Sequence, residues 1–239
     1  PQEYWSIAAH FLHNPPFSAH LIHVGDTQLD KLALSSQKAA DEIISDLEKA
    51  SYETARVEKK ETQRNPLPPF TTSTLQQAAS YRLGFSARQT MVLAQQLYES
   101  GLITYMRTDS LHLSAESLSA AASHIVSAWG TSYALSSPRV FKTKTKGAQE
   151  AHEAIRPTDV ARPPASLKQH LDARQFKLYE LIWQRFVATQ MPPAIFDATT
   201  VDIESTGKRN ICTFRATGSV LKFDGFLKAY PIKTEDALL

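Results

Sequence analysis

The pattern of apolar and polar positions predicts strands at the start of the chain. Apolar residues occupy every second position from Trp5 to Phe11, and Asn14-Pro15-Pro16 separates this stretch from FSAHLIHVGD. A period of two is typical of a strand with one buried face, so we expect two strands. The next stretch, SSQKAADEIISDLEKA, predicts a helix with Ser36 as its N-cap, because its apolar residues recur at helical spacing. The charged YETARVEKKETQR that follows favours an exposed strand.

The pattern becomes helical after the proline-rich connector RNPLPPF at 64–70. Two helices are expected at roughly 74–82 and 87–100, joined by a short turn at Gly84 in a helix-turn-helix outline. Each has a candidate capping box, formed by Ser73 with Gln76 and by Ser86 with Gln89.

Two further helices are predicted before the pattern changes again. One begins at Ser114 and stops at Trp129, and a longer one begins at the Asp172/Gln175 capping box. The longer helix has one broad apolar face, formed by Phe176, Tyr179, Ile182, Trp183 and Phe186, so we expect it to be the centre of the helical part. The sequence MPPA at 191–194 ends it.

After these prolines the pattern returns to strands. We expect strands at ATTVDIE, NICTFRAT, VLKF and FLKAYP, with turns at Gly218 and at Asp224-Gly225. The fold class predicted is therefore α+β: a β-rich domain made of 1–64 and 193–239, with a helical domain inserted at 65–192. The two proline-rich crossings are compatible with hinges and equally with plain helix stops.

Charge and cysteine content narrow the function only slightly. The 239 residues carry 26 Lys and Arg against 24 Asp and Glu, a balance that does not by itself indicate a polyanion partner. The chain has one cysteine, no signal-peptide pattern and no apolar run of the roughly 18 residues needed to span a membrane. We therefore expect a cytoplasmic location without membrane attachment, and the missing start Met suggests a piece of something longer.

The segment GLITYMRTDS, 101–110, is the first stretch with candidate chemistry. Ionising a free phenol at pH 7 costs about 4 kcal/mol, and a nearby guanidinium lowers that cost. If the segment is extended, Tyr105 and Arg107 share a face, as a nucleophile and a phosphate-binding group should. The alternative is a half-buried tyrosine beside a surface arginine.

The second stretch is FKTKTKGAQEAHEAIRPTDV, 141–160, in which three lysines precede a cluster of polar residues. His152 and Arg156 are four apart, so on a helix they would face one target, and the pair suits a phosphodiester. The plain alternative is a solvated charged loop.

The sequence gives little support for a metal site or a nucleotide-binding site. HEAIR is not the HExxH motif of zinc peptidases, and the HxxH pairs at His10/His13 and His20/His23 would place their partners on opposite faces of a strand. No GxxxxGK[ST] or GxGxxG motif occurs, so we assign no metal ligand and no cofactor to this chain.

These stretches together resemble the type IA DNA topoisomerases. PPFTTSTLQQAASYRLGFSARQTMVLAQQLYESGLITYMRTDS is similar to the active-site block of that family, and AQEAHEAIRPTDV to its second signature. LYELIWQRFVATQMPPAIFDATTV and LKFDGFLKAYP also match in order, so the resemblance covers nearly the whole chain. Met106 favours the topoisomerase I branch, because topoisomerase III relatives usually have proline there.

The resemblance implies a covalent mechanism. Tyr105 would attack a phosphodiester of single-stranded or underwound DNA, forming a 5′-phosphotyrosyl link and freeing a 3′-hydroxyl, and the stored bond would permit religation without ATP. Arg107 would steady the scissile phosphate and His152 would contact the same region. Supporting or DNA-binding roles fall to Asp109, Glu150, Arg156, Arg88 and Gln95.

The chain also departs from the family pattern. The family places a magnesium-binding Toprim domain before this region, and no acidic DxD cluster appears here. The resemblance therefore implies a central fragment that needs the other domains of the enzyme, with Mg²⁺ supplied through Toprim, and that relaxes negative supercoils in the bacterial nucleoid only as part of the full enzyme. Two alternatives stay open: a non-catalytic helix-turn-helix DNA-binding module, and a regulatory scaffold without nucleic acid.

Overall fold

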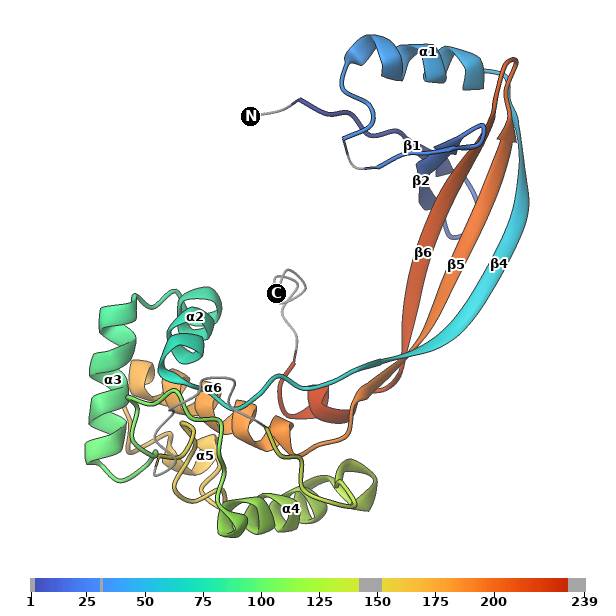
Figure 1. The fold of residues 1–239 in the computed structure, drawn as a ribbon. Helices are drawn as coiled ribbons and strands as arrows, with labels where there is room; N and C mark the ends of the chain where they lie inside the picture. The colour runs from blue at the N-terminus through green and yellow to red at the C-terminus, as the bar shows by residue number, and fades with distance from the viewer. Residues whose placement is uncertain (1–2, 31, 142–151, 232–239) are drawn as a thin grey trace. The chain divides into compact units, whose positions relative to one another are not determined.

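The computed structural model describes residues 3–30, 32–141 and 152–231, and it divides the chain into two compact units. The first unit comprises Pro1–Thr62 and Phe196–Lys222, and the second comprises Gln63–Ile195 and Phe223–Leu239. One unit is built on an antiparallel sheet and the other on helices, so the predicted α+β class is confirmed (Figure 1).

The first unit is organised around a sheet with the strand order β1-β2-β6-β5-β4, to which β3 is added beside β2. Strand β2 pairs antiparallel with β1, where Ala9 lies opposite Ala19, and with β6, where Leu21 lies opposite Phe214. The strands are β1 (Ala8–Phe11), β2 (Phe17–Val24), β3 (Thr27–Gln28), β4 (Ser51–Arg64), β5 (Ala194–Thr206) and β6 (Ile211–Phe223).

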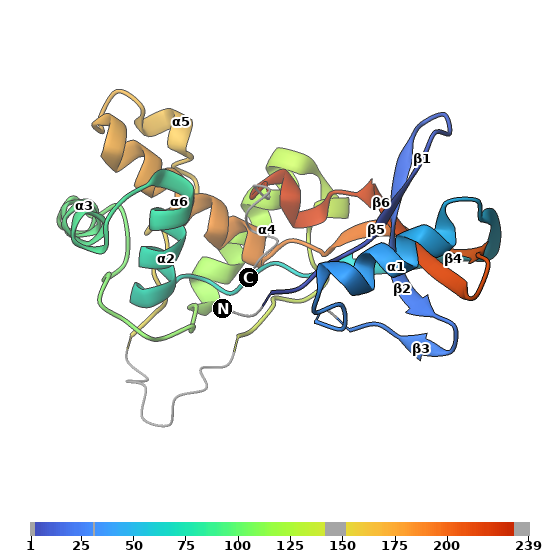
Figure 2. The ribbon, with the colours of Figure 1, turned by 90° about the horizontal axis from the view of Figure 1, so that it is seen from above.

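Helix α1 (Gln37–Leu47), seen in Figure 2, completes the core of this unit by packing on the sheet. Its N-cap is Ser36, as predicted, whose Oγ accepts a hydrogen bond from the Ala39 backbone N–H. The apolar side of α1 packs on the sheet, where the buried cluster is Ala19, Leu47, Ile203, Cys212 and Phe214. Every residue of β4 is exposed, which confirms the prediction of an exposed charged strand.

The helical unit is centred on α6 (Ala173–Thr189), which contacts α2, α3 and α5. Its apolar face is buried, as the sequence predicts, and its N-terminus has the expected reciprocal capping box between Asp172 and Gln175. The other helices are α2 (Thr72–Leu83), α3 (Ala87–Glu99), α4 (Ala115–Trp129) and α5 (Pro164–Leu167), with 3₁₀ turns η1 (Thr131–Tyr133) and η2 (Gly225–Lys228). Gly84 joins α2 to α3 in the left-handed conformation, with φ of 70°.

Three local predictions are wrong. The N-cap of helix α2 is Thr71, which forms a capping box with Thr74, and not Ser73. Gly218 is not a turn, since β6 runs through it without interruption. The stretch FLKAYP contains the turn η2 and no strand, because Phe226 and Tyr230, four residues apart, are both buried.

The end of the chain also differs from the predicted division. Residues 193–239 were assigned as a whole to the β-rich domain, whereas Phe223 onward belongs to the helical unit. The reason is the contact with α6: Arg185 stacks 4.6 Å from the Tyr230 ring centroid, and its Nη2 donates a 2.8 Å hydrogen bond to the Tyr230 hydroxyl. Within the described part of the chain, no helix has the length and apolar character to cross a membrane.

Candidate active site

The segment that carries Tyr105 has no regular secondary structure, yet its side chains alternate in exposure. Tyr105, Arg107 and Asp109 are exposed. Between them, Met106 and Thr108 are buried. This alternation agrees with the predicted period of two and places the phenol and the guanidinium outside the packed core.

The Tyr105 ring lies between two other aromatic rings of the helical unit. The Tyr98 ring, from the last turn of α3, meets it edge-on with centroids 5.3 Å apart. The His152 imidazole lies 6.0 Å away, centroid to centroid, and tilted by 46°. Because 39% of Tyr105 is exposed, the ring is held from the sides and still open to an incoming ligand.

A cavity of about 440 Å³ lies beside this tyrosine and collects polar groups from three parts of the helical unit. The first turn of α2 contributes Thr71, Thr72 and Ser73, the tyrosine segment contributes Arg107, Thr108 and Asp109, and the third contributor is His152. The N-terminus of a helix and a guanidinium both favour an anion. Arg107 has no ion-pair partner among the residues that the structure describes.

His152 reaches this cavity from a segment without regular secondary structure, and the helix that would have aligned it with Arg156 is not formed over 152–157. The backbone N–H of Ala154 donates to the His112 carbonyl at 2.9 Å, and that of Ile155 donates to the Phe70 carbonyl at 2.8 Å. These tertiary partners replace the hydrogen bonds of a helix. Ile155 and Pro157 consequently form antiparallel bridges to Phe70 and Ile103.

The Arg156 side chain points into the protein and is 12% exposed. Its Nη2 donates to Glu153 Oε2 at 2.6 Å and its Nη1 donates to the Pro157 carbonyl at 2.9 Å. Glu153 also accepts a 2.7 Å hydrogen bond from the Ser114 backbone N–H, the N-cap of α4. Burial opposes the ionisation of Glu153, but the hydrogen bonds from Arg156 and Ser114 outweigh it, so the pKa of this carboxyl lies below its ordinary value.

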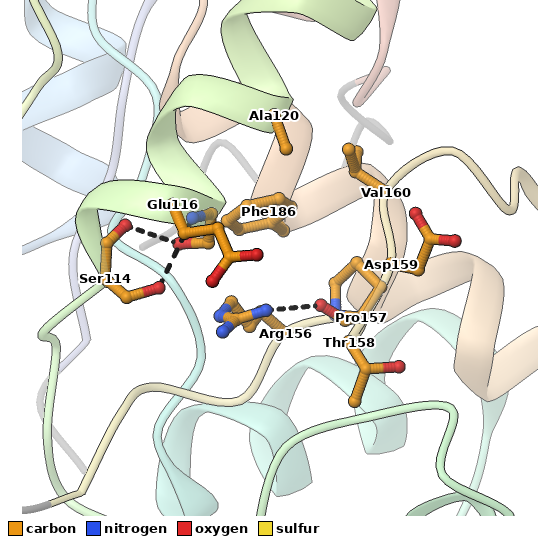
Figure 3. Close-up of a pocket in the computed structure, with 10 residues that line it drawn as sticks. Ser114, Glu116, Ala120, Arg156, Pro157, Thr158, Asp159, Val160 and Phe186 are labelled. Carbon is orange, nitrogen blue, oxygen red and sulfur yellow. Dashed lines mark hydrogen bonds between the residues drawn. The ribbon is translucent and has the colours of Figure 1, made fainter.

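Arg156 thereby lines a second cavity, of about 330 Å³, which is a different space from the one beside Tyr105 (Figure 3). The figure shows Arg156 bonded to Pro157, with Glu116 from the first turn of α4 and Asp159 among the other lining residues. A DNA contact by Arg156 stays a prediction, and its observed partners are protein groups.

The remaining predicted residues lie apart from the tyrosine cavity or outside the described residues. Glu150 and the three lysines at 142–146 fall within 142–151, outside what the structure describes. Arg88 lines another cavity, together with Arg174 at the start of α6. Gln95 donates a 2.6 Å hydrogen bond to Glu99 one turn later on α3. DNA binding by these residues stays a prediction.

Comparison with known proteins shows the family to which the chain belongs. The family model described as DNA topoisomerase matches residues 1–238. The chain belongs to the DNA topoisomerase family.

The similar proteins are bacterial DNA topoisomerases 1. The chain is 42% identical over 245 residues to DNA topoisomerase 1 of Rickettsia bellii, covering 98% of the chain and 30% of that protein. It is 44% identical over 237 residues to DNA topoisomerase 1 of Zymomonas mobilis, covering 99% of the chain and 19% of that protein. This topoisomerase chain thus spans about a third or less of the length of these relatives.

A solved structure agrees with this assignment. Full-length topoisomerase I from Thermotoga maritima superposes with a TM-score of 0.72 at 30% identity, over 96% of this chain and 37% of that one. The resemblance to bacterial topoisomerase I stated from the sequence is therefore confirmed.

The described part of the topoisomerase chain does not fit a resident divalent cation. Hard cations such as Mg²⁺ prefer several carboxylate or carbonyl oxygens. Asp109 is the single carboxylate among the residues lining the tyrosine cavity, and the described residues contain no group of three or more acidic, histidine or cysteine side chains suited to a metal. No step at this site is therefore assigned to a metal held by these residues.

Sequence reasoning missed several residues that shape this site. Tyr98 contacts Tyr105, the Thr72 hydroxyl binds the backbone at Met106, and the Thr104 hydroxyl binds the backbone at Ala154. Their partners lie up to 52 residues away in the chain, and an isolated threonine or tyrosine carries no local signal of such a contact. Thr71, Thr72 and Ser73 also line the cavity, and the N-terminus of a helix can bind phosphate.

Proposed function

We propose that this chain is the nucleophile-bearing part of a type IA DNA topoisomerase that cuts one DNA strand at a time. The Tyr105 hydroxyl loses its proton to a base or water and its oxygen bonds to phosphorus, while the bond from phosphorus to the 3′ oxygen breaks. The departing 3′ oxygen takes up a proton. The product is a 5′-phosphotyrosyl link and a free 3′-hydroxyl, and attack by that hydroxyl reverses every step.

The observation that carries the proposal is the placement of Tyr105. Its exposed ring contacts His152, and His152 lines a cavity with Arg107 and the first turn of α2. A phosphate in that cavity would meet the positive end of a helix and a guanidinium without an ion-pair partner among the described residues. A tyrosine placed for packing would need neither feature.

Arg107 and His152 have distinct roles in this proposal. Arg107 compensates the negative charge that grows on the phosphate oxygens in the transition state, which only a charged donor at the correct place can do. His152 donates a hydrogen bond to the same phosphate or a proton to the departing 3′ oxygen. Asp109 lines the same cavity and is assigned a supporting role.

The complete reaction needs more than this chain. In the full enzyme the cut strand would be held open, the other strand passed through, and the break resealed, so that negative supercoils relax in the bacterial nucleoid without ATP. The carboxylates for Mg²⁺ would come from a Toprim domain of the same enzyme. By itself the chain is expected to be inactive in relaxation, so relaxation of a supercoiled plasmid by the isolated chain would contradict this part of the proposal.

Covalent trapping tests the proposed nucleophile. Labelled single-stranded DNA is mixed with the full enzyme that contains this chain and with its Tyr105→Phe variant, denatured, and resolved by electrophoresis. We expect a denaturation-resistant adduct with the wild type and none with Tyr105→Phe. Tyr98→Phe is the matched control, because that ring touches Tyr105 and also carries a phenol.

The trapping assay also distinguishes the proposed topoisomerase part from the main alternative, a non-catalytic DNA-binding module. A non-catalytic module built on α2, Gly84 and α3 would bind DNA without forming any adduct and would prefer one duplex sequence. A topoisomerase part should favour single strands with little sequence preference. Wild-type enzyme that binds DNA but yields no adduct would support the binding module and remove the catalytic proposal.

A further inference from the structure

The catalytic segment proposed above lacks regular secondary structure, so something else must fix its geometry. Productive catalysis needs side chains held within about half an ångström of the correct place, and loops achieve this less readily than helices or strands. Two threonine hydroxyls instead link the segment to distant parts of the chain. The hydroxyl of Thr72 binds the backbone that follows Tyr105, and the hydroxyl of Thr104, which precedes Tyr105, binds the backbone at Ala154 and Arg156.

Thr104 fixes the side that precedes the tyrosine. Its Oγ1 donates a 2.7 Å hydrogen bond to the Ala154 carbonyl and accepts a 3.0 Å hydrogen bond from the Arg156 backbone N–H. Its own backbone N–H donates to the Arg156 carbonyl at 2.9 Å. One residue therefore joins the tyrosine segment to the segment at 152–157.

Thr72 fixes the side that follows the tyrosine. From the first turn of α2, its Oγ1 donates to the Met106 carbonyl at 2.8 Å and accepts a 2.9 Å hydrogen bond from the Thr108 backbone N–H. Its backbone N–H donates to the Thr108 carbonyl at 2.9 Å. The two backbone groups that the Thr72 hydroxyl binds belong to the neighbours of Arg107. Thr72 therefore fixes the backbone from which the Arg107 side chain extends.

The two hydroxyls are used in the same way. A threonine hydroxyl has one proton to donate and can also accept, and both Thr72 and Thr104 do both toward backbone groups. Both side chains are partly buried, which limits competition from water. The Thr104 hydroxyl thereby connects the segment that carries Tyr105 to the segment that carries His152. The Thr72 hydroxyl holds the backbone on both sides of Arg107, which follows Tyr105 by two residues.

We infer that Thr104 and Thr72 are positioning residues for strand cleavage, which hold Tyr105, Arg107 and His152 in register through their hydrogen bonds to the backbone. This inference rests on the proposed function. Replacing either threonine by valine removes a hydroxyl and takes a hydrogen-bond partner from two backbone groups. These are the Met106 carbonyl and the Thr108 N–H for Thr72, and the Ala154 carbonyl and the Arg156 N–H for Thr104. Small displacements of reacting groups are costly, so we expect cleavage to slow by about ten- to a hundred-fold.

The test uses four variants of the full enzyme in two matched pairs. Thr104→Val and Thr72→Val remove a hydroxyl, whereas Thr104→Ser and Thr72→Ser retain it. Thr90→Val is the control, because Thr90 is fully buried in α3 and its Oγ1 donates a 2.9 Å hydrogen bond to the Ser86 carbonyl away from the tyrosine cavity. For each protein we would measure the rate of adduct formation at saturating single-stranded DNA, the Kd for the same DNA, and the urea midpoint of unfolding.

We expect the Val variants at 104 and 72 to form adduct at least tenfold more slowly, with a Kd within about twofold of the wild type, while both Ser variants recover most of the rate. Thr90→Val should lose stability without losing cleavage rate. Serine variants as slow as the valine variants, or Thr90→Val equally slow, would overturn the inference, because the loss would then reflect general destabilisation. If one Val variant does not fold, the other threonine and both Ser variants decide the question.

The two levels of the account fail in different ways. Wild-type enzyme without any Tyr105-dependent adduct would remove the proposed function and this inference together. Wild-type adduct that depends on Tyr105, combined with undiminished rates in Thr104→Val and Thr72→Val, would leave the function standing and remove only the positioning roles.

Discussion

The imidazole of His152 lies 6.0 Å, centroid to centroid, from the ring of Tyr105, although 46 positions between them, 106–151, separate the two in sequence. The contact exists because two irregular segments are bound to one another and to the first turn of α2 by backbone hydrogen bonds. It brings the family's two signature stretches to a single cavity, and this arrangement leads to the predictions that follow.

Arg107 should act on the chemical step more than on DNA affinity. We expect Arg107→Ala in the full enzyme to lower the rate of adduct formation at saturating DNA by about a hundredfold or more, because the growing charge on the phosphate loses its counter-charge. Arg107→Lys should recover only part of the loss, since an ammonium cannot bind two phosphate oxygens in the fixed geometry of a guanidinium. Single-turnover cleavage measures this rate directly.

Arg88 is the matched comparison for Arg107. It is also exposed, but it lines a cavity formed with the start of α6 and not the tyrosine cavity. Arg88→Ala should weaken DNA binding, and the slope of log binding constant against log salt concentration should decrease by about the value of one phosphate contact. The cleavage rate at saturating DNA should stay unchanged. A hundredfold loss of that rate in Arg88→Ala would show that the site extends along α3.

The ion pair of Glu153 with Arg156 should make stability depend on pH in a defined window. The folded-state pKa of Glu153 is lowered, so its contribution is fully present above the ordinary glutamate value of about 4.3 and is lost as the pH falls through the lower folded value. We expect Glu153→Gln to lower the free energy of unfolding by about 1–3 kcal/mol at pH 7. Urea unfolding of both proteins should show this difference shrinking below pH 4.

If the free energies of unfolding of the wild type and Glu153→Gln differed by the same amount down to the lowest accessible pH, the stabilising role of the ionised Glu153 would be contradicted. Glu116→Gln is a suitable control, because Glu116 lies in the first turn of the same α4 and has no ion-pair partner among the described residues. Its substitution should have a small effect, limited to the favourable interaction of a carboxylate with a helix N-terminus.

The helical domain should also lose stability at high pH through Tyr179. Burial on α6 raises the pKa of this phenol to about 12, and its hydroxyl donates a 2.7 Å hydrogen bond to the Arg162 carbonyl. Because the unfolded phenol titrates near pH 10, the stability contribution is present below pH 10 and decreases as the pH rises toward 12. We expect Tyr179→Phe to unfold with a weaker pH dependence between pH 10 and 12, measured by urea titration at each pH.

The sequence predicted those features that depend on local pattern. The structure contains the predicted helix caps at Ser36, Ser114 and Asp172 and the predicted apolar face of α6. Each of these features depends only on residues within one or two helical turns. The alternation around Tyr105 is equally local, because side chains two apart on an extended backbone share a face.

The features that were mispredicted depend on distant partners. The segment at 152–157 has charged and polar residues at helical spacing, but its backbone is hydrogen-bonded to Phe70, Thr104 and His112 from elsewhere in the chain. The stretch at FLKAYP has a strand-like composition, yet Tyr230 is fixed by Arg185 of α6. Such partners override local propensity and leave no trace in the neighbouring residues.

The most direct test of the account determines which end of the cut DNA remains bound to Tyr105. A single-stranded oligonucleotide carries one label at its 5′ end and a different label at its 3′ end, and it is cleaved by the full enzyme that contains this chain. After denaturation and protease digestion, mass spectrometry locates the nucleotide on a peptide. We predict that the 3′ label stays with the peptide containing Tyr105, and that the 5′ label is released on a fragment ending in a free 3′-hydroxyl. Attachment to another residue, or retention of the 5′ label, would contradict the proposed role of Tyr105.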